Sequence, residues 1–437
     1  MLALQGFFPS VEIIVVISTI VWPICFLYPA CTEKSIKSSL KLFPLFYVGI
    51  TLRYLFTLGE TPEYILTMLG MAILVSILLF IPFFVYGILY RKFENGLVTL
   101  AFPILFFIVQ LAFSQLMHMG NSMDPVTAVS CIPVLAQNVA LVGEMGLSLI
   151  MTWMWAAIVC IADKKSVKVR VVFSAICAAL LVFGFVYGAV RLSGRTGKED
   201  SLRVAFLTSV KENFYDPIDT SKDERYIELF EKLMSEISES ETDLIMTNEE
   251  FAFLDSTRFE EYMVRVRAAI AKAHVPTLFC YGKYETGGDE IMYYDSAILF
   301  DENGEQVTKF SKHNRILLVE TGSVLPGDDE PAEAVITIKG KPRKVAIAIC
   351  FDLNDELFIN KMSEDTELIL APSWDWYNVC YFQPRNTLLR AIECNATLIK
   401  ATYSGIAFTA DEYGIINDEE DTLDRYEQVV YLDVPVD

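Results

Sequence analysis

The sequence predicts a polytopic α-helical membrane domain followed by an α/β domain, and hydropathy, charge and residue pattern all indicate it. The chain is 53% hydrophobic with a mean hydropathy of +0.39, which is too apolar for an ordinary soluble protein. Residues 1–198 contain 13 Lys and Arg against 8 Asp and Glu, whereas residues 199–437 contain 22 against 48. Apolar runs give way to short β-rich runs near residue 195. We therefore expect two domains, 1–194 and 195–437.

The first domain contains about six apolar segments, each near the length that crosses about 30 Å of hydrocarbon. They cover residues 12–31, 42–58, 65–89, 97–117, 141–162 and 170–191. Arg53 interrupts the second segment, and residues 124–140 suit either an interfacial or re-entrant segment or a loop. Since no Lys or Arg precedes Lys34, Met1–Cys31 lacks the basic region of a cleaved signal peptide.

Basic residues alternate between the loops of this domain, which predicts its orientation. Lys and Arg follow the first, third and fifth segments, whereas residues 59–64 and 118–140 contain neither. Six crossings then place the N-terminus and residues 195–437 outside. We expect a multi-pass protein of the cytoplasmic membrane, with the lipid bilayer as a partner and the second domain on the extracytoplasmic side.

The second domain alternates short β-rich runs with amphipathic stretches, a pattern typical of α/β domains. Helical spacing predicts helices over Glu224–Ile237, Ser256–His274 and Phe382–Cys394. The predicted strands are Arg203–Thr208, Asp243–Thr247, Thr277–Tyr281, Asp295–Phe300, Lys344–Ile349, Glu367–Ala371 and Thr397–Thr402.

Several classes of function lack support in this sequence. The chain has nine cysteines and three histidines but no Cys-x-x-Cys motif, so we expect no metal site. No glycine-rich phosphate loop and no basic patch is present, which excludes nucleic acid as an expected partner and a nucleotide as an expected cofactor. We predict an enzyme without a cofactor.

Glu249 and Cys350 follow predicted strands, where α/β sheets expose residues to a crevice, and Lys312 follows the hairpin-like segment Phe300–Glu305, whose Asn-Gly supplies a turn. A thiol is mostly protonated near neutral pH, so Cys350 needs a base and a cation to act as a nucleophile. Glu249 is the candidate base, and Lys312 can stabilise both the thiolate and an oxyanion. The backbone N–H of Phe351 is a second candidate oxyanion donor.

Each of these residues alone has an ordinary interpretation. Cys350 suits a small core residue, Lys312 beside His313 suits a solvated loop, and Glu249 suits an acidic helix start. Their ordered combination favours catalysis, with Glu250 as a rival to Glu249 because the two are adjacent.

Five segments in this order resemble the nitrilase, or carbon–nitrogen hydrolase, superfamily. Asp243–Glu249 resembles the segment that ends in the catalytic Glu, Phe310–Lys312 the aromatic-x-Lys segment, and Ala348–Asp352 the nucleophile elbow. Arg390–Glu393 and Lys400–Ile406 resemble the closing helix and strand. The resemblance implies an αββα sandwich.

The resemblance also extends the set of site residues. Glu320, eight residues after Lys312, falls where a second active-site Glu is expected to orient the lysine or assist proton transfer. Phe351 and Asp352 follow the nucleophile and are expected at the oxyanion or substrate site. Trp374 and Tyr403 are core aromatics by default, but the resemblance places Ser373–Trp376 along the pocket rim.

Joined to membrane helices, this domain resembles the apolipoprotein N-acyltransferase family. That resemblance is supported by Pro133–Ala136, which leads to Gly146–Leu149, and by Arg203–Ala205. It implies transfer of an acyl chain from a phospholipid donor to an amine acceptor, the N-terminus of a lipoprotein, through a Cys350 thioester.

The sequence departs from that pattern in several places, which leaves other functions open. Thr247-Asn248 replaces Trp-Pro, Phe351-Asp352 replaces Tyr-Glu, and only Thr321–Arg343 stands where the family has a longer arm. One alternative is a membrane-tethered amidase or nitrilase that hydrolyses a C–N bond. A further alternative is a non-catalytic nitrilase-fold membrane receptor or scaffold.

Overall fold

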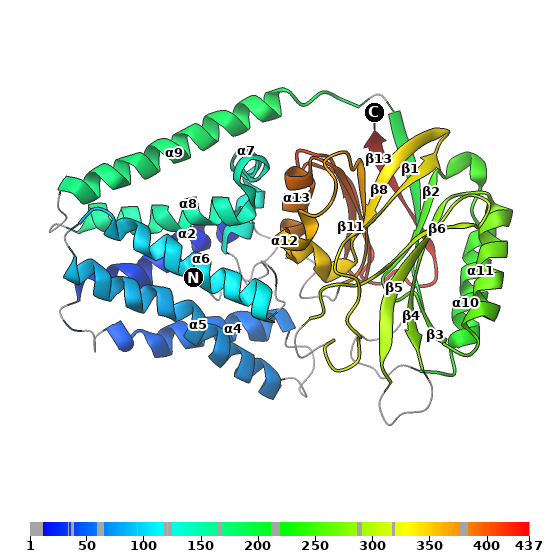
Figure 1. The fold of residues 1–437 in the computed structure, drawn as a ribbon, viewed down its shortest axis with the longest axis horizontal. Helices are drawn as coiled ribbons and strands as arrows, with labels where there is room; N and C mark the ends of the chain where they lie inside the picture. Colours follow the sequence, from blue (N-terminus) through cyan, green and yellow to red (C-terminus); the bar gives the residue numbers. More distant parts are fainter. Residues whose placement is uncertain are drawn as a thin grey trace. The chain divides into compact units, whose positions relative to one another are not determined.

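The structure is a computed structural model whose described residues form two compact units (Figure 1), and the chain passes from one to the other between Gly194 and Arg195. The first unit is helical and the second contains both sheets. The structure describes residues 12–33, 35, 39–58, 65–93, 95–117, 120, 125–163, 168–198, 200–210, 219–285, 291–316, 320–375 and 383–436.

Long apolar helices dominate the first unit: α2 (Glu12–Thr32), α4 (Phe43–Leu58), α5 (Ile65–Lys92), α6 (Val98–Met117), α8 (Val139–Ala162) and α9 (Lys168–Ser193). Among the described residues, five helices are long and apolar enough to cross a membrane, namely α2, α5, α6, α8 and α9. Helix α4, the second predicted span, has 16 residues and covers about 24 Å, less than the ~30 Å of a bilayer core. The side chain of Arg53 lies outside the described residues.

Aromatic side chains hold this helical unit together. The indole of Trp22 packs against Phe46 and Phe83 at centroid distances of 5.9 and 5.8 Å, and against Trp155 at 6.2 Å. These four residues come from α2, α4, α5 and α8, and all are almost fully buried. Because lipid is as apolar as these helices, close packing of this kind is what associates them.

Two short helices occupy most of the segment 124–140, η2 (Pro125–Cys131) and α7 (Pro133–Ala136). Helix α8 follows and is broken at Gly143, whose φ of 68° and ψ of 171° are open to glycine and costly for any residue with a Cβ.

The first sheet of the α/β unit has the strand order β13-β1-β2-β4-β5-β6, with β3 paired to β4. Strands β1, β2 and β4 are parallel, whereas β13, β5 and β6 run antiparallel to their neighbours. The bounds are β1 (Asp200–Leu207), β2 (Leu244–Thr247), β3 (Ala252–Asp255), β4 (Thr277–Tyr284), β5 (Tyr293–Phe300), β6 (Gln306–Ser311) and β13 (Val429–Val436).

The second sheet has the order β12-β11-β10-β9-β8-β7, with β8, β9 and β10 parallel at its centre. All residues of β9 and β10 and the last three of β8 are buried, as expected for strands covered on both faces. The bounds are β7 (Ala332–Ile338), β8 (Lys341–Ile347), β9 (Leu368–Trp374), β10 (Thr397–Tyr403), β11 (Ile406–Ala410) and β12 (Ile416–Asp421).

Alternation along β1 shows how the layers stack. Leu202, Val204 and Phe206 join a core that includes residues of both sheets, whereas Ala205 and Leu207 join a core with helices α10 (Asp223–Ser235) and α11 (Phe259–Ala273). The second sheet carries α13 (Gln383–Cys394) and the short α12 (Glu356–Ile359) on its other face (Figure 1). The predicted fold class, membrane-type helices followed by an αββα sandwich, is confirmed.

Strands beyond the predicted ones complete both sheets: β3, β6, β7, β11, β12 and β13. Strand β7 lies inside Thr321–Arg343, so part of that connection belongs to the second sheet. The three predicted helices of this unit are present, with ends that differ from the prediction by at most three residues.

Candidate active site

The predicted site residues follow the ends of strands in both sheets. Glu249 lies two residues after β2 and Lys312 directly after β6, both in the first sheet. Cys350 lies three residues after β8, while Trp374 and Tyr403 are the last residues of β9 and β10 in the second sheet. The sandwich therefore brings residues distant in sequence to one region.

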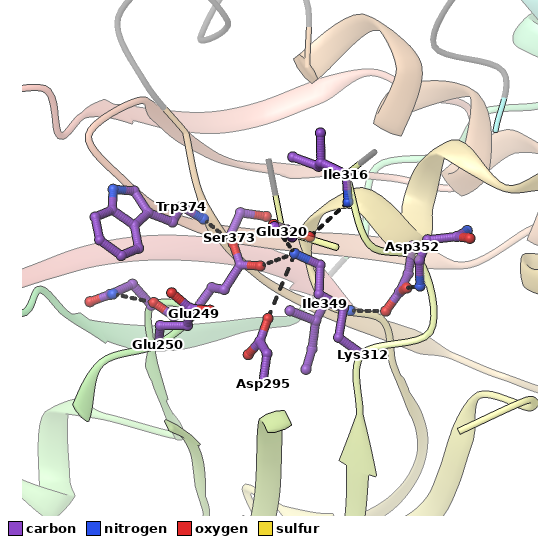
Figure 2. A network of polar contacts seen from close by, with 12 residues as sticks. Glu249, Glu250, Asp295, Lys312, Ile316, Glu320, Ile349, Asp352, Ser373 and Trp374 are labelled. Carbon is purple, nitrogen blue, oxygen red and sulfur yellow. Dashed lines mark hydrogen bonds and ion pairs between the residues drawn. The ribbon is translucent and has the colours of Figure 1, made fainter. Parts of the chain in front are cut away.

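Lys312 lies at the centre of a buried polar cluster (Figure 2). Its Nζ donates to Oε1 of Glu249 at 2.6 Å and to Oε1 of Glu320 at 2.7 Å. Burial alone lowers the pKa of a lysine, but the Glu249 and Glu320 carboxylates outweigh burial and raise the pKa of Lys312 well above its usual value. The site therefore contains a fixed, buried ammonium group.

Both glutamates that bind Lys312 are also held by the backbone. Oε2 of Glu249 accepts the backbone N–H of Trp374 at 2.6 Å, and Oε2 of Glu320 accepts that of Ile316 at 2.8 Å. Burial raises the pKa of Glu320, while Lys312 opposes this increase. Glu249 thus belongs to the first sheet but is oriented by the end of a strand in the second.

Cys350 has a backbone φ of 44°, which is strained for a residue other than glycine. It begins the 3₁₀ helix η4 (Cys350–Asn354), which follows β8 after two intervening residues. Such a sharp turn presents a nucleophile at the end of a strand. Burial and the Glu249 carboxylate raise the pKa of the thiol well above its usual value, against the opposing effect of Lys312, so the resting thiol is protonated and requires a base.

Asp352 supports this turn through the backbone. Its Oδ2 accepts the N–H of Ile349 at 2.9 Å and its Oδ1 accepts that of Asn314 at 2.6 Å. Burial raises the pKa of Asp352 to about 8. Both carboxylate oxygens thus accept backbone N–H groups, one from the residue directly before Cys350 and one from the residue two positions after Lys312.

The aromatic candidates are largely buried beside the cluster. The rings of Trp374 and Tyr403 meet edge to face at 5.5 Å, and the Tyr403 hydroxyl donates to the carbonyl of Val210 at 2.8 Å. Phe351 is 8% exposed and lies in η4. Trp376 lies outside the described residues.

The structure adds two carboxyl groups to the predicted cluster. Glu250, considered above as a rival base, accepts a hydrogen bond from the Tyr293 hydroxyl at 2.7 Å, and burial followed by the Glu249 charge raises its pKa to about 8. Asp295, in β5, lies with Oδ2 at 3.6 Å from Nζ of Lys312. Sequence reasoning missed Asp295, although it is the one charged residue of β5 (Tyr293–Phe300), which is a usable signal.

Chemically, the cluster supplies a carboxylate base, a cation and a thiol in a region shielded from water. Within the part of the chain that the structure describes, no group of three or more His, Cys, Asp and Glu side chains is placed to hold a metal ion. Electrostatic interaction of Cys350 with Glu249, Lys312 and Glu320 shows that all four predicted catalytic residues lie in one neighbourhood.

Comparisons with known proteins give matches among solved structures. No family model matches this sequence, and no curated protein matches it. An amidase of the nitrilase superfamily from Nesterenkonia sp. AN1, solved as a cysteine-to-alanine variant, is 17% identical, covers 55% of this chain and 92% of its own, and has a TM-score of 0.45. The same type of variant in complex with butyramide is 17% identical, covers 55% of this chain and 92% of its own, and has a TM-score of 0.44. A glutamate-to-leucine variant carries the acetamide moiety of fluoroacetamide on its active-site cysteine. It is 17% identical, covers 55% of this chain and 93% of its own, and has a TM-score of 0.45. These solved structures, to which the chain is similar, are amidases of the nitrilase superfamily.

Proposed function

We propose that this protein is a membrane-bound acyltransferase that moves an acyl chain from a phospholipid to an amine through a thioester on Cys350. The observation that carries the proposal is the buried bridge from Glu249 through Lys312 to Glu320, at 2.6 and 2.7 Å, beside a cysteine on a strained turn. A buried base and cation next to a thiol are what nucleophilic acyl transfer requires.

In the first half-reaction, Glu249 accepts the proton of the Cys350 thiol, and the thiolate attacks the carbonyl carbon of the donor ester. An N–H of Lys312 and the backbone N–H of Phe351 stabilise the resulting oxyanion. The C–O bond then breaks, and the departing alcohol, a lysophospholipid, takes the proton from Glu249. The acyl group remains bound to sulfur as a thioester.

In the second half-reaction, the acceptor amine attacks the thioester carbonyl. Glu249 accepts a proton from the attacking nitrogen, the C–S bond breaks, and the thiol is restored with that proton. Glu320 holds Lys312 in place during both steps, since it binds the same ammonium group at 2.7 Å. The lipoprotein N-terminus is the proposed acceptor.

The proposal of a lipid donor is supported by helices α2, α5, α6, α8 and α9, each of which is long and apolar enough to cross a membrane. A protein held at the bilayer encounters acyl chains without transferring them through water, which would cost about 0.8 kcal/mol per CH₂. The alternation of basic loops further supports placing the α/β unit on the extracytoplasmic side of the cytoplasmic membrane.

Hydrolysis is the second candidate, because the same cluster activates water as readily as an amine. A membrane-tethered amidase would form the same type of acyl-enzyme and release the acid. The two functions differ only in which nucleophile resolves the thioester, so a single preparation distinguishes them.

The test is intact-mass measurement of the purified full-length protein after incubation with a defined diacyl phospholipid in detergent micelles. We expect a mass increase equal to one acyl chain, which disappears on treatment with hydroxylamine. The adduct should be absent from Cys350→Ala. Cys394→Ala is the matched control, because Cys394 lies at the end of α13 in the same unit, and it should retain the adduct.

Addition of a synthetic lipopeptide with a free amino terminus then decides between the two functions. Loss of the adduct with formation of an N-acyl peptide supports transfer. Loss at the same rate in buffer alone supports hydrolysis. Absence of any adduct on both the wild type and Cys394→Ala would refute a phospholipid-derived thioester.

A further inference from the structure

Asp295 is a buried carboxyl group at the edge of the Lys312 cluster. It lies within β5 with its side chain fully shielded from solvent. Among the described residues, no N–H or O–H group donates a hydrogen bond to either of its oxygens. The cation facing it is Lys312, whose Nζ lies 3.6 Å from Oδ2 (Figure 2). That separation is longer than a hydrogen bond.

Charge balance around Lys312 requires that some carboxyl groups carry protons. One ammonium group faces Glu249, Glu320 and Asp295 within 3.6 Å, and Glu250 adds a fourth carboxyl group next to Glu249. Four ionised carboxylates would leave the buried cluster with a large net negative charge. In a site of low polarity, a carboxylate without compensation takes up a proton instead.

Hydrogen bonding indicates which carboxyl group is protonated first. Glu249 and Glu320 each accept two N–H groups, one from Lys312 and one from the backbone. Glu250 accepts one hydroxyl, that of Tyr293. Donors stabilise the charged form of a carboxylate, so the proton belongs on Asp295, which accepts none among the described residues.

The contact between Asp295 and Glu249 supports the same assignment. Oε1 of Glu249 and Oδ2 of Asp295 lie 2.6 and 3.6 Å from the same Nζ of Lys312, so the two carboxyl groups are close neighbours. Since an ionised carboxylate can only accept, two carboxyl groups form a hydrogen bond only when one of them holds a proton.

We propose that Asp295 is a positioning residue that is held as a neutral carboxylic acid and donates a hydrogen bond to Glu249. In this state Asp295 does not compete with Glu249 and Glu320 for the N–H groups of Lys312. Glu249 remains the proposed base. The assignment of the proton stands on the cluster alone, and only its catalytic consequence rests on the proposed function.

The groups that face Asp295 agree with this assignment. Burial, followed by the charges of Glu249 and Glu250, raises the pKa of Asp295 well above its usual value, and Lys312 opposes them. Cys280 of β4 and Tyr293 of β5 are the other titratable groups that interact with Asp295. Burial holds the pKa of both well above the usual values of a thiol and a phenol, so neither adds a charge near neutral pH.

The test compares the thermal unfolding of the full-length wild type and Asp295→Asn between about pH 5 and pH 8. A carboxyl group with a raised folded-state pKa loses its contribution to stability as the pH rises above its unfolded-state pKa. Asn keeps the shape and a donor without taking up a proton. We therefore expect the Tm of Asp295→Asn minus that of the wild type to increase by about 3 °C per pH unit.

A flat or falling difference would overturn the proposal, because an ionised Asp295 would be an ion-pair partner that Asn cannot replace. Asp375→Asn is the matched control. Asp375 is an equally buried carboxylate that contacts Nζ of Lys400 directly, so its loss should lower the Tm at every pH tested. Failure of Asp295→Asn to fold under conditions where Asp375→Asn folds would also overturn the proposal.

An activity measurement adds a second readout. The yield and rate of the Cys350 acyl adduct should stay within about threefold of the wild type in Asp295→Asn and fall by at least about tenfold in Asp295→Ala, which cannot donate to Glu249. A loss as large in Asp295→Asn as in Asp295→Ala would contradict the neutral form. If no adduct forms in the wild type, the proposed function fails while the thermal comparison still decides the state of Asp295.

Discussion

Replacement of Lys312 by methionine tests the buried cluster most directly. Methionine has a similar length but no charge, so it removes the cation and leaves Glu249 and Glu320 in place. Two N–O contacts of 2.6 and 2.7 Å are lost. We expect Lys312→Met to lose acyl-adduct formation and to lower the free energy of unfolding.

The size of the stability loss follows from the contacts. At an effective dielectric constant of about 20, each contact supplies roughly 6 kcal/mol of attraction, which is offset by the several kcal/mol that burial of the ammonium group costs. Removing one partner of a buried ionic group typically costs about 3–5 kcal/mol. For an α/β unit of this size, that loss corresponds to a decrease in Tm of about 6–20 °C.

The loss should also depend on pH. Lys312 lowers the pKa of Glu320 against the effect of burial, so without the lysine the folded-state pKa of Glu320 rises further. A raised carboxyl pKa gives stability that is lost as the pH rises. The stability deficit of Lys312→Met should therefore be larger near pH 8 than near pH 5.

Differential scanning fluorimetry of the full-length protein in detergent measures both quantities. Lys344→Met is the control, because Lys344 contacts Asp365 at 2.5 Å in an exposed ion pair and should change the Tm little. A Lys312→Met protein with a Tm within about 2 °C of the wild type, or with a deficit that does not vary with pH, would refute this account of the cluster.

Three further predictions concern neighbouring groups and topology. Burial raises the pKa of Glu250 to about 8. The Tm of Glu250→Gln minus that of the wild type should therefore rise with pH and level off near pH 8. A difference that does not change with pH would contradict the raised pKa of Glu250. Asp352→Ala leaves two buried backbone N–H groups without an acceptor and should cost about 2–6 kcal/mol in chemical denaturation, whereas a cost below about 1 kcal/mol would argue against its role. A single cysteine that replaces Lys92, in a background with reduced cysteine content, should react with an impermeant maleimide only after cell lysis. A single cysteine that replaces Glu305 should react in intact cells. Reaction of both on the same side of the membrane would refute the predicted orientation.

The core of the α/β unit could be predicted because its central strands are short, apolar and bounded by turn residues. Strands β2, β8, β9 and β10 have no exposed residue apart from two at the start of β8, so the residues that follow them stood out. Glu249 and Cys350 were therefore accessible to sequence reasoning.

Strand β12 shows what local sequence could not predict. Its sequence, Ile-Asn-Asp-Glu-Glu-Asp, consists mostly of residues that are depleted in strands. It forms a strand because it pairs along its length with β11 at the edge of the second sheet. Tertiary pairing outweighed local preference there, and no pattern in the chain indicates the partner.

Asp295 escaped prediction for a similar reason. Its proximity to Lys312 follows from the antiparallel pairing of β5 and β6, in which the Lys312 N–H donates to the Asp295 carbonyl at 2.9 Å. The hydrogen bond from Trp374 to Glu249 joins residues 125 positions apart. Such contacts arise from the register of strands and sheets, which the one-dimensional pattern does not contain.

If Glu249 is the base, as we propose, the hydrogen bond from the Trp374 backbone to Glu249 makes the reaction sensitive to changes in packing far from the reacting atoms. Glu249 follows a strand of one sheet and Cys350 a strand of the other, and the layer between the sheets includes side chains such as Val204 and Met246. A larger or smaller side chain in that layer would make the sheets slide or separate slightly. Since a displacement of about 1 Å can reduce a rate 100-fold, substitutions in this layer should impair acylation before they unfold the protein.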